Sequence, residues 1–282
     1  MNEYENEQLQ AIIAWKKEEP GVISKAFGTV MKPVTWLIQK IIPQSAFKGL
    51  IDGANSTAEM LTDKDDIIKT ANDILSGNST FNIISDIRDL RHKNLNLSDD
   101  LANEIHNWAI GMATAEGAAT GATGIFGLSA DIPIIITLAL RTIHKIGLCY
   151  GYECVNEIDK QFVLIILAAS SSNSIAEKTT SLIMLREIQV LISKQTWKSL
   201  VEKATQQQFS KEWAIIGLKN LAKQLGVNLT KRKALQAIPV VGAMVGGSVN
   251  GWYIKDVGWA ARHMFQERWL LDNHPDDDHL KN

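Results

Sequence analysis

Cysteine is scarce in this chain: 282 residues contain only two, Cys149 and Cys154. Their spacing of five matches neither the CxxC redox pattern nor the usual spacing of zinc ligands. On a helix, this spacing would point the two thiols to different sides. We therefore expect two reduced thiols that fill space in a cytoplasmic protein.

The start of the sequence lacks a secretory signal. Residues 1–7 are acidic and polar, whereas a signal peptide carries a basic region followed by an apolar one. From this we expect a chain that is not secreted. A phosphate loop, a GxSxG nucleophile elbow and any recognisable cofactor motif are also missing, so no cofactor is expected.

An excess of basic residues is missing as well. Lys and Arg total 29 against 31 Asp and Glu, which gives a formal net charge of -2. A general nucleic-acid binder needs a basic field that releases counterions, so we expect no nucleic-acid partner. The one dense basic run is Lys231-Arg232-Lys233. It is typical of a solvated helix start, and contact with phosphates or lipid headgroups is the alternative.

Strand-like alternation of apolar and polar residues is hard to find, whereas apolar residues recur every three or four positions along almost the whole chain. This pattern predicts an all-α protein, with one large domain of about ten or more helices over residues 1–271 and a polar tail over residues 272–282. A hydrophobic content of 45% excludes global disorder. In the second half, helices are predicted over residues 132–150, 153–169, 176–193, 197–207, 211–225, 234–253 and 256–271.

A long helix is predicted to begin after Ser98. Ser98 is suited to the N-cap, and Asp99 and Asp100 would then lie in the first turn, where the helix dipole favours acids. The apolar stripe that begins at Leu101 ends at Glu116.

Two glycine- and alanine-rich apolar helices are expected to organise the domain, one near residues 117–127 and one near residues 242–251. A glycine inside a helix costs roughly 1 kcal/mol relative to alanine. Several glycines in register therefore need a compensating gain, usually the close approach of another backbone. The favoured interpretation is that these helices cross each other or a neighbour inside a core. The small residues at such a crossing would be Gly117, Gly121, Gly242, Gly246 and Asn250.

Membrane contact is the alternative interpretation of the second stretch. Residues 234–254 form a run of 21 residues without a formal charge, and about 20 apolar residues can cross a bilayer. This run contains Gln236, Pro239 and Asn250, so its hydrophobicity is marginal. It suits a buried helix or a shallow, reversible membrane contact better than a permanent span.

Isolated charges stand out in the first apolar region. Between residues 105 and 140 the only formal charges are Glu116 and Asp131, and Arg141 follows directly. A carboxylate among apolar residues is costly unless it is paired or hydrogen-bonded. Asp131 suits the N-cap of a helix that opens at Ile132-Pro133. Glu116 suits a buried pair with Arg141 or a hydrogen bond to a helix end. The functional alternative is a carboxyl group of raised pKa at a ligand or catalytic site.

The second half offers a parallel polar set, Asn250, Asp256 and Arg268. Asp256 could pair with Arg262 or Arg268, or lie on a solvated face. Asp256, His263 and Glu267 can share one helical face, which would allow a metal site. The spacing is looser than that of a motif such as HExxH, so this indication is weak and no metal is expected.

Two blocks of sequence resemble signatures of the EcsC family of bacterial proteins. The resemblance spans most of the chain, and its one departure is Glu153, where the family more often has Asp. The first block comprises Glu116-Gly117, Thr120-Gly121, Gly127, Ala130-Asp131-Ile132-Pro133, Leu140-Arg141-Thr142-Ile143 and Tyr150-Gly151-Tyr152-Glu153. The second comprises Ile238-Pro239-Val240-Val241-Gly242-Ala243, Gly246, Asn250, Asp256, Phe265 and Arg268-Trp269.

The resemblance implies a location and no reaction. The family is named for a protein encoded beside an ABC-type transporter, and no biochemical activity is firmly assigned to it. The resemblance implies a helical protein that is either cytoplasmic or peripheral to the inner face of the membrane. The matched residues that could form a shared polar centre are Glu116, Asp131, Arg141, Tyr150, Tyr152, Asn250, Asp256 and Arg268.

Three hypotheses about function remain. The favoured one is a non-enzymatic, membrane-peripheral or lipid-contacting accessory protein whose partner is an anionic membrane surface or a membrane transporter. The alternative is a small-molecule binder or hydrolase-like enzyme with Glu116, Asp131, Arg141 and either Tyr150 or Tyr152 as catalytic candidates. In the third, the same residues are caps and buried pairs that hold the two halves of the chain together.

Overall fold

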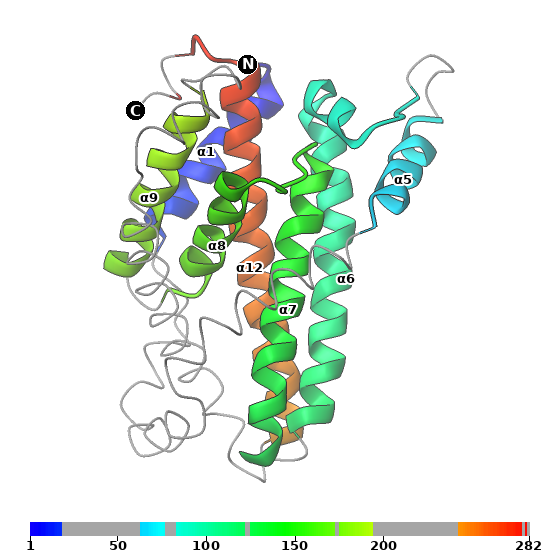
Figure 1. Cartoon of the computed structure of the whole chain (residues 1–282), viewed down its shortest axis with the longest axis vertical. Helices are drawn as coiled ribbons and strands as arrows, with labels where there is room; N and C mark the ends of the chain where they lie inside the picture. Colours follow the sequence, from blue (N-terminus) through cyan, green and yellow to red (C-terminus); the bar gives the residue numbers. More distant parts are fainter. Residues whose placement is uncertain are drawn as a thin grey trace.

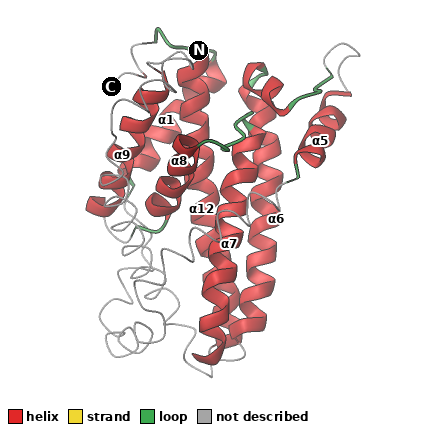
Figure 2. Ribbon diagram, viewed as in Figure 1, coloured by secondary structure: helices red, strands yellow, loops and turns green. Residues whose placement is uncertain are grey.

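The computed structural model describes residues 1–18, 63–76, 83–121, 125–172, 175–193, 242–277 and 280. In this part of the chain every regular element is a helix, which confirms the predicted all-α class (Figure 2). The count of ten or more helices stays a prediction, because the helices expected over 197–207 and 211–225 lie outside the described residues. The elements are α1 (Glu3–Lys17), α5 (Lys64–Ser76), the 3-10 helix η1 (Ile87–His92), α6 (Leu95–Gly121), α7 (Ile125–Cys149), α8 (Glu157–Ser170), α9 (Ile175–Ser193) and α12 (Gly242–Asn273).

Three long helices, α6, α7 and α12, lie side by side and form the centre of the molecule (Figure 1). The most extensive contact between any two described helices is that of α6 with α12. Helices α1, α8 and α9 gather around the C-terminal half of α12, on the side away from α5. Helix α12, near the C-terminus, therefore packs against α1 from the N-terminal end and against helices from the middle of the sequence.

Two glycines of α12 allow the close approach of α6. A Cβ atom at Gly258 would lie 2.1 Å from Cδ2 of His106, so the imidazole ring occupies the space of the missing side chain. A Cβ atom at Gly251 would lie 2.5 Å from Oγ1 of Thr114. Close packing on a glycine is thus present at this interface, and Gly251 belongs to the stretch in which it was expected.

The first glycine-rich stretch is divided between two helices. Helix α6 ends at Gly121 and α7 begins at Ile125, so the prediction of one helix over residues 117–127 is wrong. Gly117 is buried in α6, and Gly242 and Gly246 lie near the start of α12. The idea that two glycine-rich helices organise the domain stays a prediction.

Two predicted N-caps are also wrong. Helix α6 begins at Leu95, so Ser98 and Asp99 lie inside its first turns, and both side chains are buried. Helix α7 begins at Ile125, so Asp131 lies within the helix and does not open it. The side chain of Asp131 lies outside the described residues. In both cases the helix extends further toward its N-terminus than the capping residue suggested.

Helix α12 is longer than predicted. It runs without a break from Gly242 to Asn273, where separate helices were expected on either side of Lys255. Its last residues make specific contacts: Asp272 accepts a hydrogen bond from Tyr152 Oη at 2.7 Å, and Asn273 Nδ2 donates to the carbonyl of Arg91 at 3.0 Å. The division of the chain into a domain and a tail after residue 271 stays a prediction.

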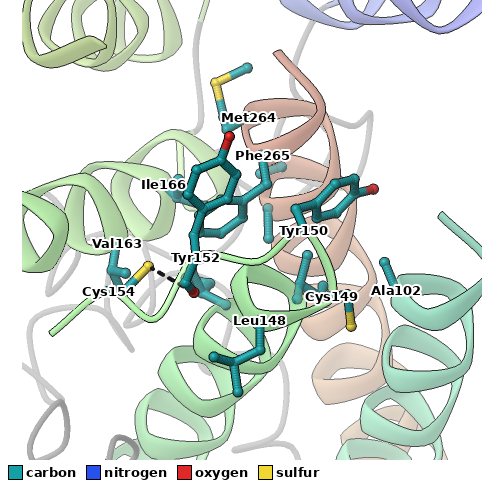
Figure 3. Packing of buried hydrophobic residues seen from close by; sticks show 14 of the residues in the cluster. Ala102, Leu148, Cys149, Tyr150, Tyr152, Cys154, Val163, Ile166, Met264 and Phe265 are labelled. Atoms are coloured by element: carbon teal, nitrogen blue, oxygen red, sulfur yellow. Dashed lines mark hydrogen bonds between the residues drawn. The ribbon is translucent and has the colours of Figure 1, made fainter. Parts of the chain in front are cut away.

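Both cysteines are free and buried among the core side chains of Figure 3. Cys149 is the last residue of α7, and burial raises the pKa of its thiol well above the usual range. Cys154 lies beyond the helix, with a φ of 52°. The two cysteines thus do not share a helix, and both thiols fill space in the core.

Within the described residues, no helix has the length and apolar character that a membrane span requires. Of the uncharged run 234–254, residues 234–241 lie outside the described part of the chain. The remainder forms the first turns of α12, where Asn250, Tyr253 and Ile254 are buried.

Candidate functional site

Asp99 is the centre of a buried polar cluster that joins four parts of the chain. Its carboxylate accepts hydrogen bonds from Tyr4 Oη of α1 at 2.7 Å, from Gln266 Nε2 of α12 at 2.8 Å, and from Tyr150 Oη, which follows α7. Asp99 itself belongs to α6 and is 3% exposed. The cluster therefore fixes how α1, α6, α7 and α12 meet at one end of the bundle.

Burial raises the pKa values of the acidic groups in this cluster. Loss of water raises the pKa of Asp99, and the three donated hydrogen bonds and the nearby charge of Arg262 lower it by less. The phenols respond in the same direction, since burial raises the pKa of Tyr150 well above its usual value. The cluster thus holds a carboxyl group that gains a proton more readily than one in water.

The raised pKa predicts how stability depends on pH. Because the folded state binds the Asp99 proton more tightly than the unfolded state, this residue contributes stability at low pH that is lost as pH rises from the unfolded pKa, about 3.9, through the raised folded value. We expect wild type to gain free energy of unfolding relative to Asp99→Asn as pH is lowered from 8 to 4, close to the unfolded pKa. Urea denaturation at both values measures this difference. The opposite trend would show a carboxylate that is stabilised as an anion.

A second buried cluster surrounds Tyr152. The guanidinium of Arg268 lies 4.1 Å from the centre of the Tyr152 ring, and its Nη1 donates to Asp159 Oδ1 at 2.7 Å. Both members of this ion pair are 7% exposed. The predicted alternatives for Asp256 included a pair with Arg268, but Asp159 of α8 is the partner of Arg268, and Asp256 is exposed.

Gly151 directs the two tyrosines into their clusters. Its φ of 84° is in the left-handed region that favours glycine, and a Cβ atom there would lie 2.7 Å from the backbone nitrogen of Arg91. Arg91 Nε donates to the Gly151 carbonyl at 2.7 Å. Tyr150 and Tyr152 then stack near the Phe265 ring at 6.4 and 5.8 Å between centres (Figure 3).

The structure separates residues that one hypothesis placed together. Glu116 lies 17 positions after Asp99 on α6, which corresponds to about 25 Å along the helix. Tyr150 contacts Asp99 and therefore lies near the opposite end of α6 from Glu116. Arg141 lies between these ends, with its guanidinium 5.1 Å from the centre of the Trp108 ring.

The weak metal candidates have other contacts. Glu267 pairs with Lys16 at 2.5 Å, and His263 Nδ1 lies 3.2 Å from Gln266 Oε1. In the described part of the chain, no group of three or more His, Cys, Asp or Glu side chains could hold a metal ion. Asp256, His263 and Glu267 share a helix without forming such a group.

A groove of about 890 Å³ lies next to these clusters, between α1, α8, α9 and α12. Its apolar wall contains Ala11 and Ala14 of α1, and its aromatic side chains are Trp15 and Trp259. The remaining residues that line it are Lys17, Glu18, Ala169, Ser170, Ser172, Lys178, Lys255, Asp256 and His263. Sequence reasoning did not find this groove, because its walls come from opposite ends of the chain.

His263 connects the groove to the Asp99 cluster. Its ring stacks on that of Trp259, at 5.5 Å between centres, and lies tilted against that of Trp15, at 5.3 Å. Since Gln266 Nε2 donates to Asp99, Gln266 Oε1 is left as the acceptor for His263 Nδ1–H. Burial lowers the pKa of His263 to about 4, so the ring is neutral near pH 7, with Nε2 as a hydrogen-bond acceptor.

Comparison with known proteins identifies similarity to the EcsC family of proteins. A sequence model of the EcsC protein family matches residues 6–270. Of the similar proteins of Bacillus subtilis (strain 168), the uncharacterized protein YdbA is 24% identical over 275 residues, which cover 95% of this chain and 93% of YdbA. The protein EcsC is 25% identical over 191 residues, which cover 68% of this chain and 72% of EcsC. No solved structure matches the chain.

Proposed function

The chain belongs to the EcsC protein family, and from that premise we propose that it is a non-enzymatic accessory protein that contacts the surface of an anionic membrane. One observation carries the proposal: Trp252 and Trp259 are 47% and 38% exposed on α12. They are seven residues apart, about two helical turns, and so share one face. We call this face, with Lys255 and Asp256 between the two rings, the tryptophan face.

Tryptophan is well suited to the boundary between lipid and water. Its large ring favours an apolar environment while its N–H keeps a polar partner, and it is enriched where membranes meet water. A lysine near an anionic surface adds about 1 kcal/mol of attraction. Lys255 supplies one such charge, and the neighbouring Asp256 opposes it, so the tryptophans would provide most of the affinity.

The basic run Lys231-Arg232-Lys233 supports the same proposal of contact with an anionic membrane. It lies outside the described residues, and in sequence it precedes the uncharged run that enters α12. Three closely spaced cations would add electrostatic attraction to anionic headgroups. Salt weakens this attraction, because charges more than about 8 Å apart are screened at physiological ionic strength. The proposal therefore includes an affinity that falls as salt is raised.

Flotation with vesicles tests the proposal directly. We expect the full chain to float with vesicles that contain phosphatidylglycerol at low salt, and to float less in 0.5 M salt or with pure phosphatidylcholine. In cells, a corresponding fraction should sediment with membranes and be released by a high-salt wash. A chain that stays at the bottom of the gradient with anionic vesicles at low salt would contradict the proposal.

A membrane transporter is the protein partner that the family resemblance implies. Such a partner lies in the same membrane, so a peripheral protein held on the inner face would meet it in two dimensions. Chemical crosslinking in membranes, compared between wild type and a variant that no longer floats, tests this addition. Crosslinks to a transporter that persist when flotation is lost would show that lipid contact is not needed for the encounter.

A further inference from the structure

The groove between α1, α8, α9 and α12 has the size and lining of a ligand site. Its volume of about 890 Å³ lies within the usual range for small-molecule pockets, about 300–1,000 Å³. The apolar part of its wall consists of Ala11, Ala14 and Ala169 with the rings of Trp15 and Trp259. An unbranched apolar chain fits a wall of small side chains beside aromatic rings.

The charged part of the lining is more basic than acidic. The lining contains three lysines, Lys17, Lys178 and Lys255, and two acids, Glu18 and Asp256. Lys178 is the most deeply placed of these cations, at 5% exposure. The lining thus favours a ligand with an anionic group over a ligand with a cationic group.

The aromatic rings reinforce this choice. The ammonium of Lys178 lies 4.2 Å from the centre of the Trp15 ring, and the guanidinium of Arg262 lies 4.6 Å from that of Trp259. Both rings also contact the His263 ring. A cationic ligand would need an unoccupied aromatic face, and here protein cations and an imidazole already cover these rings.

Lys178 retains capacity for a ligand. Its ammonium donates to the carbonyls of Trp15 and of Glu18, the latter at 3.1 Å, at the C-terminal end of α1. The helix dipole favours a cation at this position. An ammonium has three N–H groups, so one remains available to an anion in the groove.

We infer that this groove binds one single-chain anionic amphiphile. The anionic head, a carboxylate or a phosphate, lies at Lys178 and Lys255, and the acyl chain lies along the alanine and tryptophan wall. Neutral His263 offers an acceptor to a hydroxyl group near the head. The inference deepens the proposed function, because such a ligand would come from the membrane that the tryptophan face contacts.

The test is a titration of the full chain without vesicles, below the critical micelle concentration of each probe. Sodium oleate represents the carboxylate source and lysophosphatidylglycerol the phosphate source, with dodecyltrimethylammonium as the cationic comparison. Isothermal titration calorimetry reports binding, and so does intrinsic tryptophan fluorescence, to which Trp15 and Trp259 in the groove contribute together with the other six tryptophans. We expect saturable one-to-one binding of at least one anionic probe and none of the cation. The anionic probe that binds identifies the head group.

A pair of matched variants locates the binding. Ala14 is exposed on the groove wall, so Ala14→Phe fills the groove without disturbing the core, and we expect at least a tenfold loss of affinity. Gln10→Phe is the control. It lies one turn earlier on the same helix and outside the lining, and its ring leans toward the N-terminus, away from the groove. Both variants should keep the melting temperature of wild type.

A second pair tests the charge. Lys255→Glu should weaken binding several-fold, whereas Lys69→Glu on the exposed face of α5 should not. No saturable binding of either anion, equal binding of the cation, or wild-type affinity in Ala14→Phe would each overturn the inference. Absent binding with preserved flotation rejects the groove alone, and binding without flotation rejects the membrane proposal alone.

Discussion

Replacing Arg268 with methionine is expected to lower the free energy of unfolding by about 3–5 kcal/mol, the cost of leaving one partner of a buried ion pair alone. Arg268 Nη1 donates to Asp159 Oδ1 at 2.7 Å, and both residues are 7% exposed. Without the guanidinium, the Asp159 carboxylate would remain buried with no cation, and Tyr152 would lose the cation that lies 4.1 Å from its ring. Chemical denaturation measures the loss.

Two further variants separate charge from packing in this result. The double variant Asp159→Asn with Arg268→Met should recover part of the loss, because no unpaired carboxylate remains. Arg88→Met is the matched control, since Arg88 pairs with Asp86 at 2.5 Å on the exposed surface, and we expect little change there. An Arg268→Met protein as stable as Arg88→Met would refute a structural role for the buried pair.

Gly258→Ala is expected to cost about 2–4 kcal/mol, from overpacking and one lost hydrogen bond. The new Cβ atom would lie 2.1 Å from His106 Cδ2, so the imidazole must move. It would then lose the contact of His106 Nε2 with the carbonyl of Lys255 at 3.0 Å. Because this contact joins α6 to α12, the loss falls on the largest helix interface of the described chain.

Gly111→Ala is the matched control for this prediction. Gly111 lies in the interior of α6, and a Cβ atom there would meet nothing within 4 Å. Alanine is the better helix former, so this variant should be more stable than wild type by up to about 1 kcal/mol. Thermal melts of the two variants should therefore move in opposite directions. A Gly258→Ala protein with the melting temperature of wild type would contradict the prediction, because it would show that α6 and α12 repack around the new methyl group at little cost.

The periodicity of apolar residues predicted the helices well and their ends poorly. Helices α8 and α9 lie within a few residues of their predicted ranges. Helix α12 was divided in two, because Lys255-Asp256 resembled a break between apolar runs. On a helix those two residues occupy an exposed face while Tyr253, Ile254 and Val257 stay buried, so charge at one turn does not end the helix.

Some members of the two buried polar clusters could be predicted from the sequence, and their partners could not. The family resemblance singled out Tyr150, Tyr152 and Arg268, all of which are buried in polar clusters. Their partners Asp99 and Asp159 were missed, because each is an acid near the start of a helix, where exposed acids are common. Only tertiary packing buries them, and the partners are far away in sequence.

The groove could not be predicted from the sequence either, because the residues that line it come from distant parts of the chain. Its walls require α1 from one end of the chain and α12 from the other, and no local pattern joins Trp15 to His263.

The proposed membrane contact depends most on the tryptophan face, and flotation of Trp252→Ala with phosphatidylglycerol vesicles tests it most directly. Trp252 is outside the groove lining, so the result does not depend on a groove ligand. Trp108→Ala is the control, because Trp108 is 39% exposed but belongs to α6. We predict a roughly five- to tenfold loss of vesicle partitioning for Trp252→Ala, from the apolar area it would bury, and no loss for Trp108→Ala. Equal partitioning of wild type and both variants would contradict the account.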